Sequence, residues 1–386
     1  TRFKCDWSSD VCSSDLGTSS SGKSVIAREI MRQSERPFLY YSVDHIVNYW
    51  IDEKFVALED EPKAWFFHQH VQSEPGRTAP HRVEGPDTHQ LHWDMIESLM
   101  VFVKKGYDLI IDEVLWNREI FQRYTPLLCH ANSVFLFKII CNLIECERRE
   151  KQRVDRFVGL ARALYEQVYI SPPDYDFEVD TTYKTIQQSA TDILQFVQQN
   201  RPHAFLDYVR AEVSLHPLTE EHFGLLTQWM NTAHVASWWG ENKSWTLKDV
   251  QEKYTTYVKG YKLNANQKKP ISAFLIYCAE QPIGYIQFYN AHDFPREGYT
   301  LSGSISSLAA LDLYIGEPAY LGKGIGVAAI KKLLKEFIWP RFEACLVDPD
   351  LSNMQAIRAY EAAGFKTIKQ LSSSPVVLML QKRNNK

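Results

Sequence analysis

The sequence predicts a two-domain α/β protein, in which a parallel sheet flanked by helices is followed by a second domain of mixed α/β structure. The chain has 386 residues, about twice the length of an ordinary domain. In its first half, short apolar runs alternate with helical patterns, which is typical of a parallel sheet. The second half contains a predicted hairpin, and each half has one glycine-rich loop that leads directly into a helix.

Composition and charge exclude several classes of protein. Hydrophobic residues make up 45% and charged residues 23% of the chain, as in ordinary globular proteins. The longest apolar run, 134–144, includes Lys138 and is too short for a membrane-spanning helix of about 20 residues. The seven Cys show no CxxC spacing, which argues against a disulfide scaffold and a zinc ribbon. Net charge is −4, and neither half has the concentrated basic surface of a nucleic-acid binder. We therefore expect a cytoplasmic protein without nucleic-acid or membrane partners.

The first sixteen residues do not fit the segment that follows them. A buried parallel strand is normally apolar, whereas residues 8–16 read SSDVCSSDL. We expect 1–16 to be a non-native or disordered segment, so that the first domain spans 17–200.

Residues 17–24, GTSSSGKS, match the phosphate-binding pattern G-x-x-x-x-G-K-[ST]. In such a loop Gly17 and Gly22 let backbone N–H groups face phosphate oxygens, Lys23 supplies positive charge and the Ser24 hydroxyl ligates Mg²⁺. A helix is predicted to begin at Val25, and its N-terminus favours an anion. A serine-rich turn without a ligand is the alternative.

The next elements are predicted in β-α-β order. A strand at 38–43 ends at Asp44, and a helix at 92–104 leads to a strand at 109–111 that ends at Asp112. A further strand is predicted at 134–140. Ligands of open parallel sheets lie beyond the carboxyl ends of the strands, which places both aspartates at the expected site, with Asp112 as a second Mg²⁺ ligand.

The segment 147–156 carries four arginines on a predicted helix. It is either a solvated charged helix or a lid that brings guanidinium groups to a phosphoryl group. The chain resembles the chloramphenicol phosphotransferase family over about residues 17–200. The resemblance rests on this arginine segment, the loop at 17–24, SVD at 42–44, IIDEV at 110–114 and YDFEVDTT at 175–182. The resemblance implies a P-loop kinase that uses ATP and Mg²⁺ on a hydroxylated small molecule. It also implies that Asp44 is the general base and that the lid residues are Arg149, Arg153 and Arg156.

A linker without regular structure is predicted at 201–212, followed by a second domain at 213–386. This domain is expected to begin with a short strand at 213–215 and a helix at 220–231. A second helix, with a capping box at Thr246, is predicted at 247–257. A hairpin of strands at 273–277 and 283–289 and a further strand at 307–314 follow.

The loop LGKGIG at 321–326 is followed at once by a helical pattern. Alternating glycines and exposed N–H groups at a helix start suit a pyrophosphate, whereas the dinucleotide pattern G-x-G-x-x-G is absent. A plain glycine turn is the alternative. After a strand at 344–347, Asn353 is predicted to cap a helix that ends at Gly364.

Together, G-x-G-x-G and N-x-x-A-x-x-x-Y-x-x-x-G-F resemble the GNAT acetyltransferases over about residues 213–380. The usual Arg or Gln at the head of the first motif is Leu321 here, which leaves the backbone donors in place. The resemblance implies a mixed α/β fold that binds acetyl-CoA through Leu321, Gly322, Gly324, Gly326 and Asn353. It also implies that Tyr360 is the general acid near the leaving sulfur.

Within GNAT, this segment is most similar to the aminoglycoside 6'-N-acetyltransferases. The matching pieces are Trp238-Trp239-Gly240, WTL at 245–247, Asp312 and Asp348. The resemblance implies that Asp312 is the base or amine anchor, that Asp348 is a second anchor and that Trp238 or Trp239 faces a sugar ring. Composition alone also fits core tryptophans and surface carboxylates. Cys345 lies in an apolar strand, which predicts an inert buried thiol.

The sequence thus predicts a bifunctional antibiotic-modifying enzyme that joins a kinase to an aminoglycoside acetyltransferase. Two alternatives stay open. One is an acetyltransferase that acts on a hydroxylated amine in siderophore assembly. The other is a first domain that binds a nucleotide without turning it over.

Overall fold

The computed structural model describes residues 10–16, 20–42, 66–74, 77–84, 86–113, 118–153, 158–159, 161–162, 165, 174–239, 243–294, 305–370 and 375–383. The chain divides into two compact units, Thr1–Tyr208 and Val209–Lys386. Both are α/β units, as the sequence predicts.

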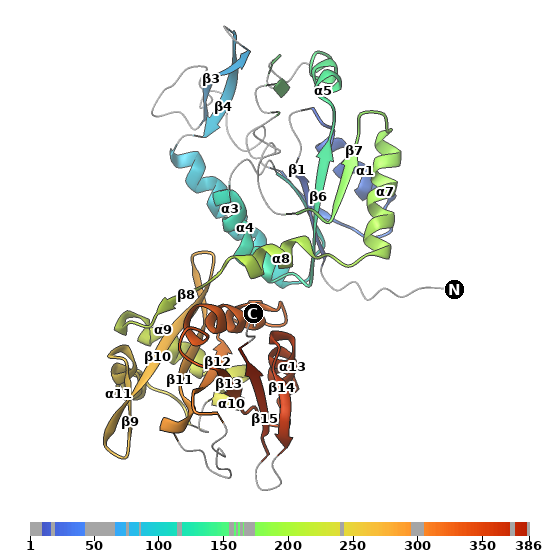
Figure 1. Cartoon of the computed structure of the whole chain (residues 1–386). Coiled ribbons are helices and arrows are strands. Elements are labelled where there is room, and N and C mark those ends of the chain that lie inside the picture. Colours follow the sequence, from blue (N-terminus) through green and yellow to red (C-terminus); the bar gives the residue numbers. More distant parts are fainter. Residues whose placement is uncertain are drawn as a thin grey trace. The chain divides into compact units, whose positions relative to one another are not determined.

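A five-stranded parallel sheet forms the centre of the first unit (Figure 1). Its order is β2-β5-β1-β6-β7, and the strands are β1 (Asp10–Leu16), β2 (Leu39–Ser42), β5 (Leu109–Asp112), β6 (Ser133–Ile140) and β7 (Phe177–Asp180). Figure 1 shows helices on both sides of the sheet: α1 (Lys23–Gln33) with α7 (Ile186–Gln199), and α3 (Pro86–Lys104) with α4 (Arg118–Cys129). A separate hairpin consists of β3 (Phe66–Glu74) and β4 (Arg77–Glu84). The predicted parallel sheet flanked by helices is confirmed.

The central strand is β1, so the part of 1–16 that the structure describes, Asp10–Leu16, is ordered rather than disordered. That the segment is non-native stays a prediction. Val11 is the register partner of Leu109 on β5 and of Val134 on β6. The expectation was based on side-chain polarity, but strand pairing uses backbone N–H and C=O groups, which a polar segment supplies equally well.

The linker predicted at 201–212 contains a helix, α8 (Ala204–Ala211), so the expectation of irregular structure there is wrong. Ala204, Phe205, Tyr208 and Val209 are all buried. This spacing of i, i+1, i+4 and i+5 places them on one helical face, and burial of that face stabilises α8. The division between the two units falls within this helix.

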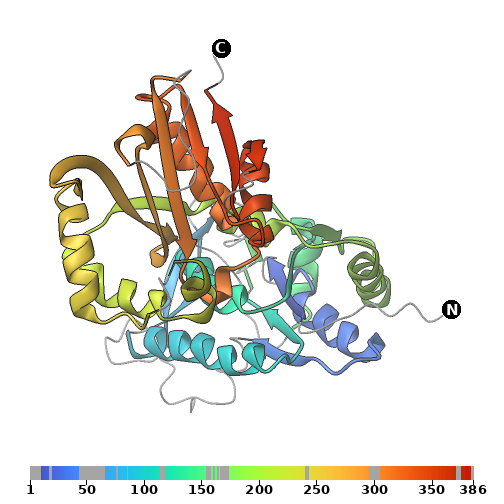
Figure 2. The same cartoon turned by 90° about the horizontal axis from the view of Figure 1, so that it is seen from below.

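The second unit contains a mixed sheet in the order β14-β15-β13-β12-β11-β10-β8, with β9 paired to β10. Its strands are β8 (Val213–Pro217), β9 (Tyr261–Asn264), β10 (Gln267–Cys278), β11 (Gln281–Asn290), β12 (Leu308–Ile315), β13 (Ala344–Val347), β14 (Lys366–Gln370) and β15 (Val377–Lys382). Its helices are α9 (Phe223–Met230), α10 (Ala233–Trp239), α11 (Leu247–Val258), α12 (Ile325–Leu333) and α13 (Met354–Ala363). The predicted capping box of Thr246 with Asp249 is present at the start of α11, which lies beside β9 and β10 (Figures 1 and 2).

The two faces of this sheet are covered by different helices. Tyr285 and Tyr289 of β11 belong to the core cluster that includes residues of α9, α10 and α11. Phe288 points to the opposite face, where its ring meets Phe342, which follows α12. Side chains alternate along a strand, so Gln287 lies on the same face as Tyr285. Asp312 is the register partner of Gln287 and therefore lies on that face too.

Strands β12 and β13 pair in parallel only over a short stretch. The pairs run from Leu308 with Ala344 to Ala310 with Leu346, whereas β12 continues to Ile315. Asp312 therefore lies on the part of β12 beyond the last pair with β13, and Asp348 directly follows β13. The parting of the two strands places both predicted carboxylates at the same end of the sheet.

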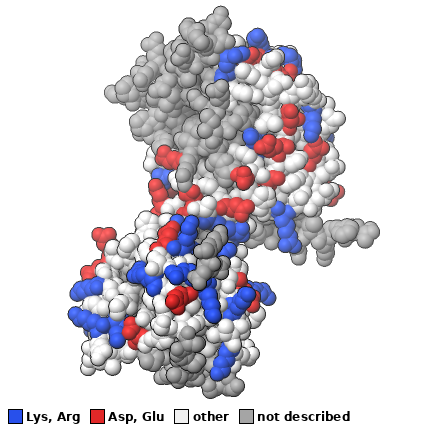
Figure 3. Space-filling view, in the orientation of Figure 1, with Lys and Arg blue, Asp and Glu red and all other residues white. Residues whose placement is uncertain are grey.

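Charged residues are unevenly distributed along the sequence. From Arg201 onward there are 21 Lys and Arg against 17 Asp and Glu, whereas the whole chain has 43 against 47. Figure 3 shows basic and acidic side chains interspersed on the visible face of each unit.

Among the described residues, no helix has the length and apolar character needed to cross a membrane.

Candidate functional site

The phosphate-binding loop of the first unit is built around the start of α1. Gly22 has a φ of 104°, a left-handed conformation that favours glycine, and Ile26 N donates to Gly22 O at 3.0 Å. This places Lys23 and Ser24 in the first turn of α1. The hydroxyl oxygens of Ser20 and Ser21 are buried and have no hydrogen-bond partner within the described residues. Unpaired buried hydroxyls beside a helix N-terminus fit a bound phosphate group.

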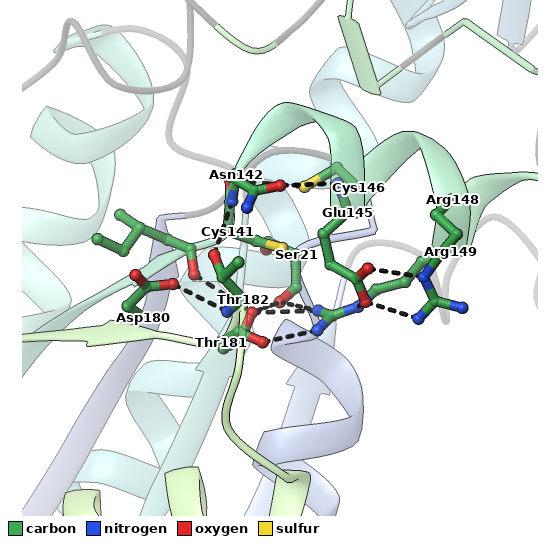
Figure 4. A network of polar contacts seen from close by, with 11 residues as sticks. Ser21, Cys141, Asn142, Glu145, Cys146, Arg148, Arg149, Asp180, Thr181 and Thr182 are labelled. Atoms are coloured by element: carbon green, nitrogen blue, oxygen red, sulfur yellow. Dashed lines mark hydrogen bonds and ion pairs between the residues drawn. The ribbon is translucent and has the colours of Figure 1, made fainter.

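Arg149 holds this loop from the side of α5 (Leu143–Glu150), as Figure 4 shows. Its Nη1 donates to Ser21 O at 3.2 Å, and its Nη2 donates to Thr181 O at 2.6 Å. The Thr181 hydroxyl also donates to Ser21 O, at 2.7 Å. A residue expected in a lid therefore binds the backbone of the loop itself.

The charge on Glu145 keeps Arg149 in place. The Arg149 Nε donates to Glu145 Oε1 at 2.8 Å, and Arg148 donates to both oxygens of the same carboxylate. Hydrogen bonds from Arg148, then Arg149, lower the pKa of Glu145 to about 2. The carboxylate is thus charged at every pH at which the protein is expected to work.

The predicted arginine helix ends earlier than expected, since α5 stops at Glu150 and Arg153 lies in the turn that follows. Gly17, Asp44 and Arg156, which the sequence also singled out, lie outside the described residues.

The two predicted Mg²⁺ ligands meet at a residue that sequence reasoning missed. The Tyr40 hydroxyl donates to Asp112 Oδ2 at 2.6 Å and is also hydrogen-bonded to Ser42 and Ser24. Burial, followed by the negative charge of Asp112, raises the pKa of Tyr40. Hydroxyl and carboxylate oxygens are the ligands that Mg²⁺ prefers, so Ser24 and Asp112 fit such an ion. The i, i+2 spacing of Tyr40 and Ser42 on a predicted strand was the available signal.

A buried polar cluster lies beside Asp112. Glu113 Oε2 accepts a hydrogen bond from the Tyr124 hydroxyl at 3.0 Å and lies 3.0 Å from His92 Nε2. All three side chains are buried. Their mutual contacts satisfy polar groups that would otherwise be costly to bury, and they fix the chain at the carboxyl end of β5.

In the second unit, the glycine loop turns into α12 through two glycines in the left-handed conformation. Gly322 and Gly324 have φ values of 74° and 77°, and Gly324 directly precedes α12. A Cβ atom added at Gly322 would meet nothing within 4 Å, so the loop is open there. The first N–H groups of a helix have no acceptor within the helix and suit an anion. Leu321 precedes these glycines, and Gly326 lies in the first turn of α12.

Asn353 and Tyr360 lie on α13. Asn353 Oδ1 accepts a hydrogen bond from Ala356 N at 3.0 Å, which confirms the predicted N-cap. Tyr360 is buried and its ring packs edge-on against Phe365. The predicted inert thiol of Cys345 is also buried.

Asp312 is held in a cross-strand chain of hydrogen bonds. Gln287 Nε2 donates to Asp312 Oδ2 at 2.8 Å, and the Tyr285 hydroxyl donates to Gln287 Oε1 at 2.7 Å. Tyr285 and Gln287 are buried, whereas Asp312 is half-buried. These hydrogen bonds therefore hold the carboxylate of Asp312 in a fixed position on a face that is otherwise aromatic. Sequence reasoning missed both supporting residues, although their i, i+2 spacing on a predicted strand was visible.

The two tryptophans have different environments. Trp239 Nε1 donates to the Tyr254 hydroxyl at 3.1 Å, and the Trp239 ring lies edge-on to Tyr285 and Tyr314. Trp238 is 51% exposed, so its ring is accessible to a ligand. Trp239 thus completes the aromatic face beside Asp312, whereas Trp238 has the exposure that a sugar-contacting ring needs.

Comparison with known proteins gives a separate result for each unit. The family model described as chloramphenicol phosphotransferase-like protein matches residues 16–198, and that of the acetyltransferase (GNAT) domain matches 219–373. The aminoglycoside N(6')-acetyltransferase type 1 of Klebsiella pneumoniae is 31% identical over 175 residues, which cover 44% of this chain and 83% of the relative. A kanamycin resistance protein of Rhizobium radiobacter is 34% identical over 76 residues, or 19% of this chain and 70% of the relative. Among solved structures, the aminoglycoside acetyltransferase AAC(6')-Ib with coenzyme A and kanamycin is 28% identical, with a TM-score of 0.38. The match covers 44% of this chain and 95% of the chain in that structure.

Proposed function

Because the chain belongs, through its second unit, to the GNAT family of aminoglycoside N(6')-acetyltransferases, we propose that this unit acetylates an aminoglycoside with acetyl-CoA. The observation that carries the proposal is the carboxylate of Asp312, which Gln287 holds at 2.8 Å beside the aromatic face where β12 and β13 part. A fixed carboxylate suits a polycationic sugar, because it binds an ammonium group and takes its proton.

In the proposed reaction, Asp312 orients the acceptor amine and removes its proton. The amine then forms a bond to the acetyl carbon while the bond from that carbon to sulfur breaks. Tyr360 donates a proton to the departing thiolate. Asp348, directly after β13, holds a second ammonium group, and the exposed ring of Trp238 contacts a sugar ring. The loop 321–326 with Asn353 holds the donor, whose thioester supplies the activated acetyl group.

For the first unit we propose ATP-dependent phosphorylation of a hydroxyl group on a small molecule. Support comes from the family match over 16–198 and from the buried, unpaired hydroxyls of Ser20 and Ser21 at the start of α1. Lys23 would bind the phosphates, Ser24 and Asp112 would hold Mg²⁺, and Asp44 would be the general base. The Mg²⁺ ion would neutralise charge on the transferring phosphoryl group. One chain would then carry two activities in the cytoplasm.

A mass-spectrometric screen tests both proposals. The full chain is incubated with acetyl-CoA and aminoglycosides or hydroxylated amines, and separately with MgATP and hydroxylated antibiotics. A mass gain of one acetyl group on an aminoglycoside supports the first proposal. Acetylation of hydroxylated amines alone would favour the siderophore alternative. ATP consumption without any phosphorylated product would contradict phosphotransfer by the first unit.

A further inference from the structure

The last turn of α8 belongs to the second unit, although it precedes the matched acetyltransferase residues 219–373. Cys278 Sγ donates to Val209 O at 3.5 Å, and Ala279 N donates to Glu212 O at 3.2 Å. Both contacts attach this turn to the β10–β11 hairpin. Residues 209–212 therefore have a fixed position in the acetyltransferase unit.

Arg210 extends from this turn to the glycine loop. Its Nε donates to Lys323 O at 2.9 Å. A Cβ atom added at Gly324 would lie 2.7 Å from Arg210 Nε and 3.2 Å from Arg210 Nη2. The guanidinium group is therefore against the backbone of Gly324, the residue that directly precedes α12.

This position brings a permanent positive charge to the point where the loop presents its backbone donors. The head of the loop, Leu321, contributes no charge or hydrogen-bonding side chain. An arginine offers five N–H donors, and its planar group suits the oxygens of a phosphate. The side chain of Arg210 is exposed, so a ligand at the loop can reach it.

We propose that Arg210 binds the phosphate groups of the acyl donor, so that the coenzyme A site of this chain includes a residue from outside the matched acetyltransferase segment. This inference depends on the proposed use of acetyl-CoA, but not on the identity of the amine. The ligand it recognises is a thioester that carries a pyrophosphate. Arg210 acts on affinity for the donor and takes no part in the chemical step.

The test measures binding of coenzyme A and of pantetheine, which lacks the pyrophosphate, to the full chain by calorimetry. Arg210→Ala should weaken coenzyme A binding by about tenfold, the usual effect of losing one charged hydrogen-bonding partner. Pantetheine binding should not change, because that molecule carries no phosphate. Arg210→Lys should retain part of the affinity for coenzyme A, since it keeps the charge without the planar group.

Arg341→Ala is the matched control, because the Arg341 Nε also donates to a backbone carbonyl, that of Phe337, at 3.2 Å. It should leave both affinities unchanged. Equal weakening of coenzyme A and pantetheine by Arg210→Ala, or no weakening, would overturn the proposal in favour of a purely structural contact. Since binding is measured without an amine, a failure to acetylate aminoglycosides would leave this result intact and would count against the proposed function alone.

Discussion

Gln287 on β11 and Asp312 on β12 are register partners, and the amide of Gln287 donates to the carboxylate of Asp312 at 2.8 Å. Strand pairing therefore places the proposed base, and one hydrogen bond sets its orientation. The hydroxyl of Tyr285 completes the chain from the buried side.

The orientation of Asp312 can be tested with Gln287→Glu. The variant keeps an acceptor for the Tyr285 hydroxyl but replaces the donor to Asp312 with a second carboxylate. Two adjacent carboxylates raise the pKa of at least one of them, so the acidic limb of the pH profile should move to higher pH. We expect kcat/KM for an aminoglycoside to fall by about tenfold at neutral pH. The exposed Gln251→Glu serves as the control, and an unshifted pH profile would remove Gln287 from the mechanism.

The close approach of Arg210 to Gly324 predicts the effect of Gly324→Val. The added side chain would meet Arg210 and would force a φ of 77° on a β-branched residue. The KM for acetyl-CoA should rise by about tenfold or more, and the KM for the amine should change little. Gly260 has a φ of 80° with nothing within 4 Å of an added Cβ, so Gly260→Val imposes similar backbone strain without touching the loop. Equal effects of the two variants on the acetyl-CoA KM would contradict the assignment.

Arg149 and Arg148 both bind Glu145, but only Arg149 reaches the phosphate-binding loop. Arg149→Ala should therefore lower affinity for MgATP by about tenfold, because the carbonyl of Ser21 loses a charged donor. Arg148→Ala should leave nucleotide affinity close to that of the unmodified chain. Titration with a fluorescent ATP analogue measures both variants, and equal losses would mean that the loop does not depend on Arg149.

The pKa of Glu145 predicts how this network depends on pH. Hydrogen bonds from Arg148 and Arg149 lower that pKa from 4.5 to about 2. A lowered pKa stabilises the folded state above the unfolded-state value, and this contribution is lost as pH falls from 4.5 towards about 2. Glu145→Gln should therefore be less stable than the unmodified chain by a constant amount above pH 4.5. The difference should shrink at lower pH, and urea unfolding at a series of pH values measures it. A difference that grows with acidity would contradict this account.

Much of the architecture was predictable because its signals are local. Apolar runs predicted β5 and β6, and the glycine pattern at 321–326 predicted the loop before α12. The capping boxes and caps at Thr246 and Asn353 are confirmed for the same reason, since each depends on residues three positions apart. The family resemblances of both halves are also confirmed by the comparisons.

What sequence reasoning missed depends on contacts between distant segments. The amphipathic spacing of α8 was overlooked, and polarity was given too much weight for β1. No local pattern shows that Arg149 reaches Ser21, or that Tyr40 joins Ser24 to Asp112, because strand order and register create those contacts. The same holds for Gln287 and Asp312, which are separated by 25 residues in the chain.

The most direct test of the account measures acetyl transfer and coenzyme A binding on the same preparations of the unmodified chain and of Asp312→Asn. The unmodified chain should add one acetyl group to an aminoglycoside. Asp312→Asn should lower kcat/KM by about 100-fold, as expected for loss of a general base, while coenzyme A affinity and melting temperature stay unchanged. If no aminoglycoside gains an acetyl group, or if Asp312→Asn turns over every accepted amine at the unmodified rate, the central claim is contradicted.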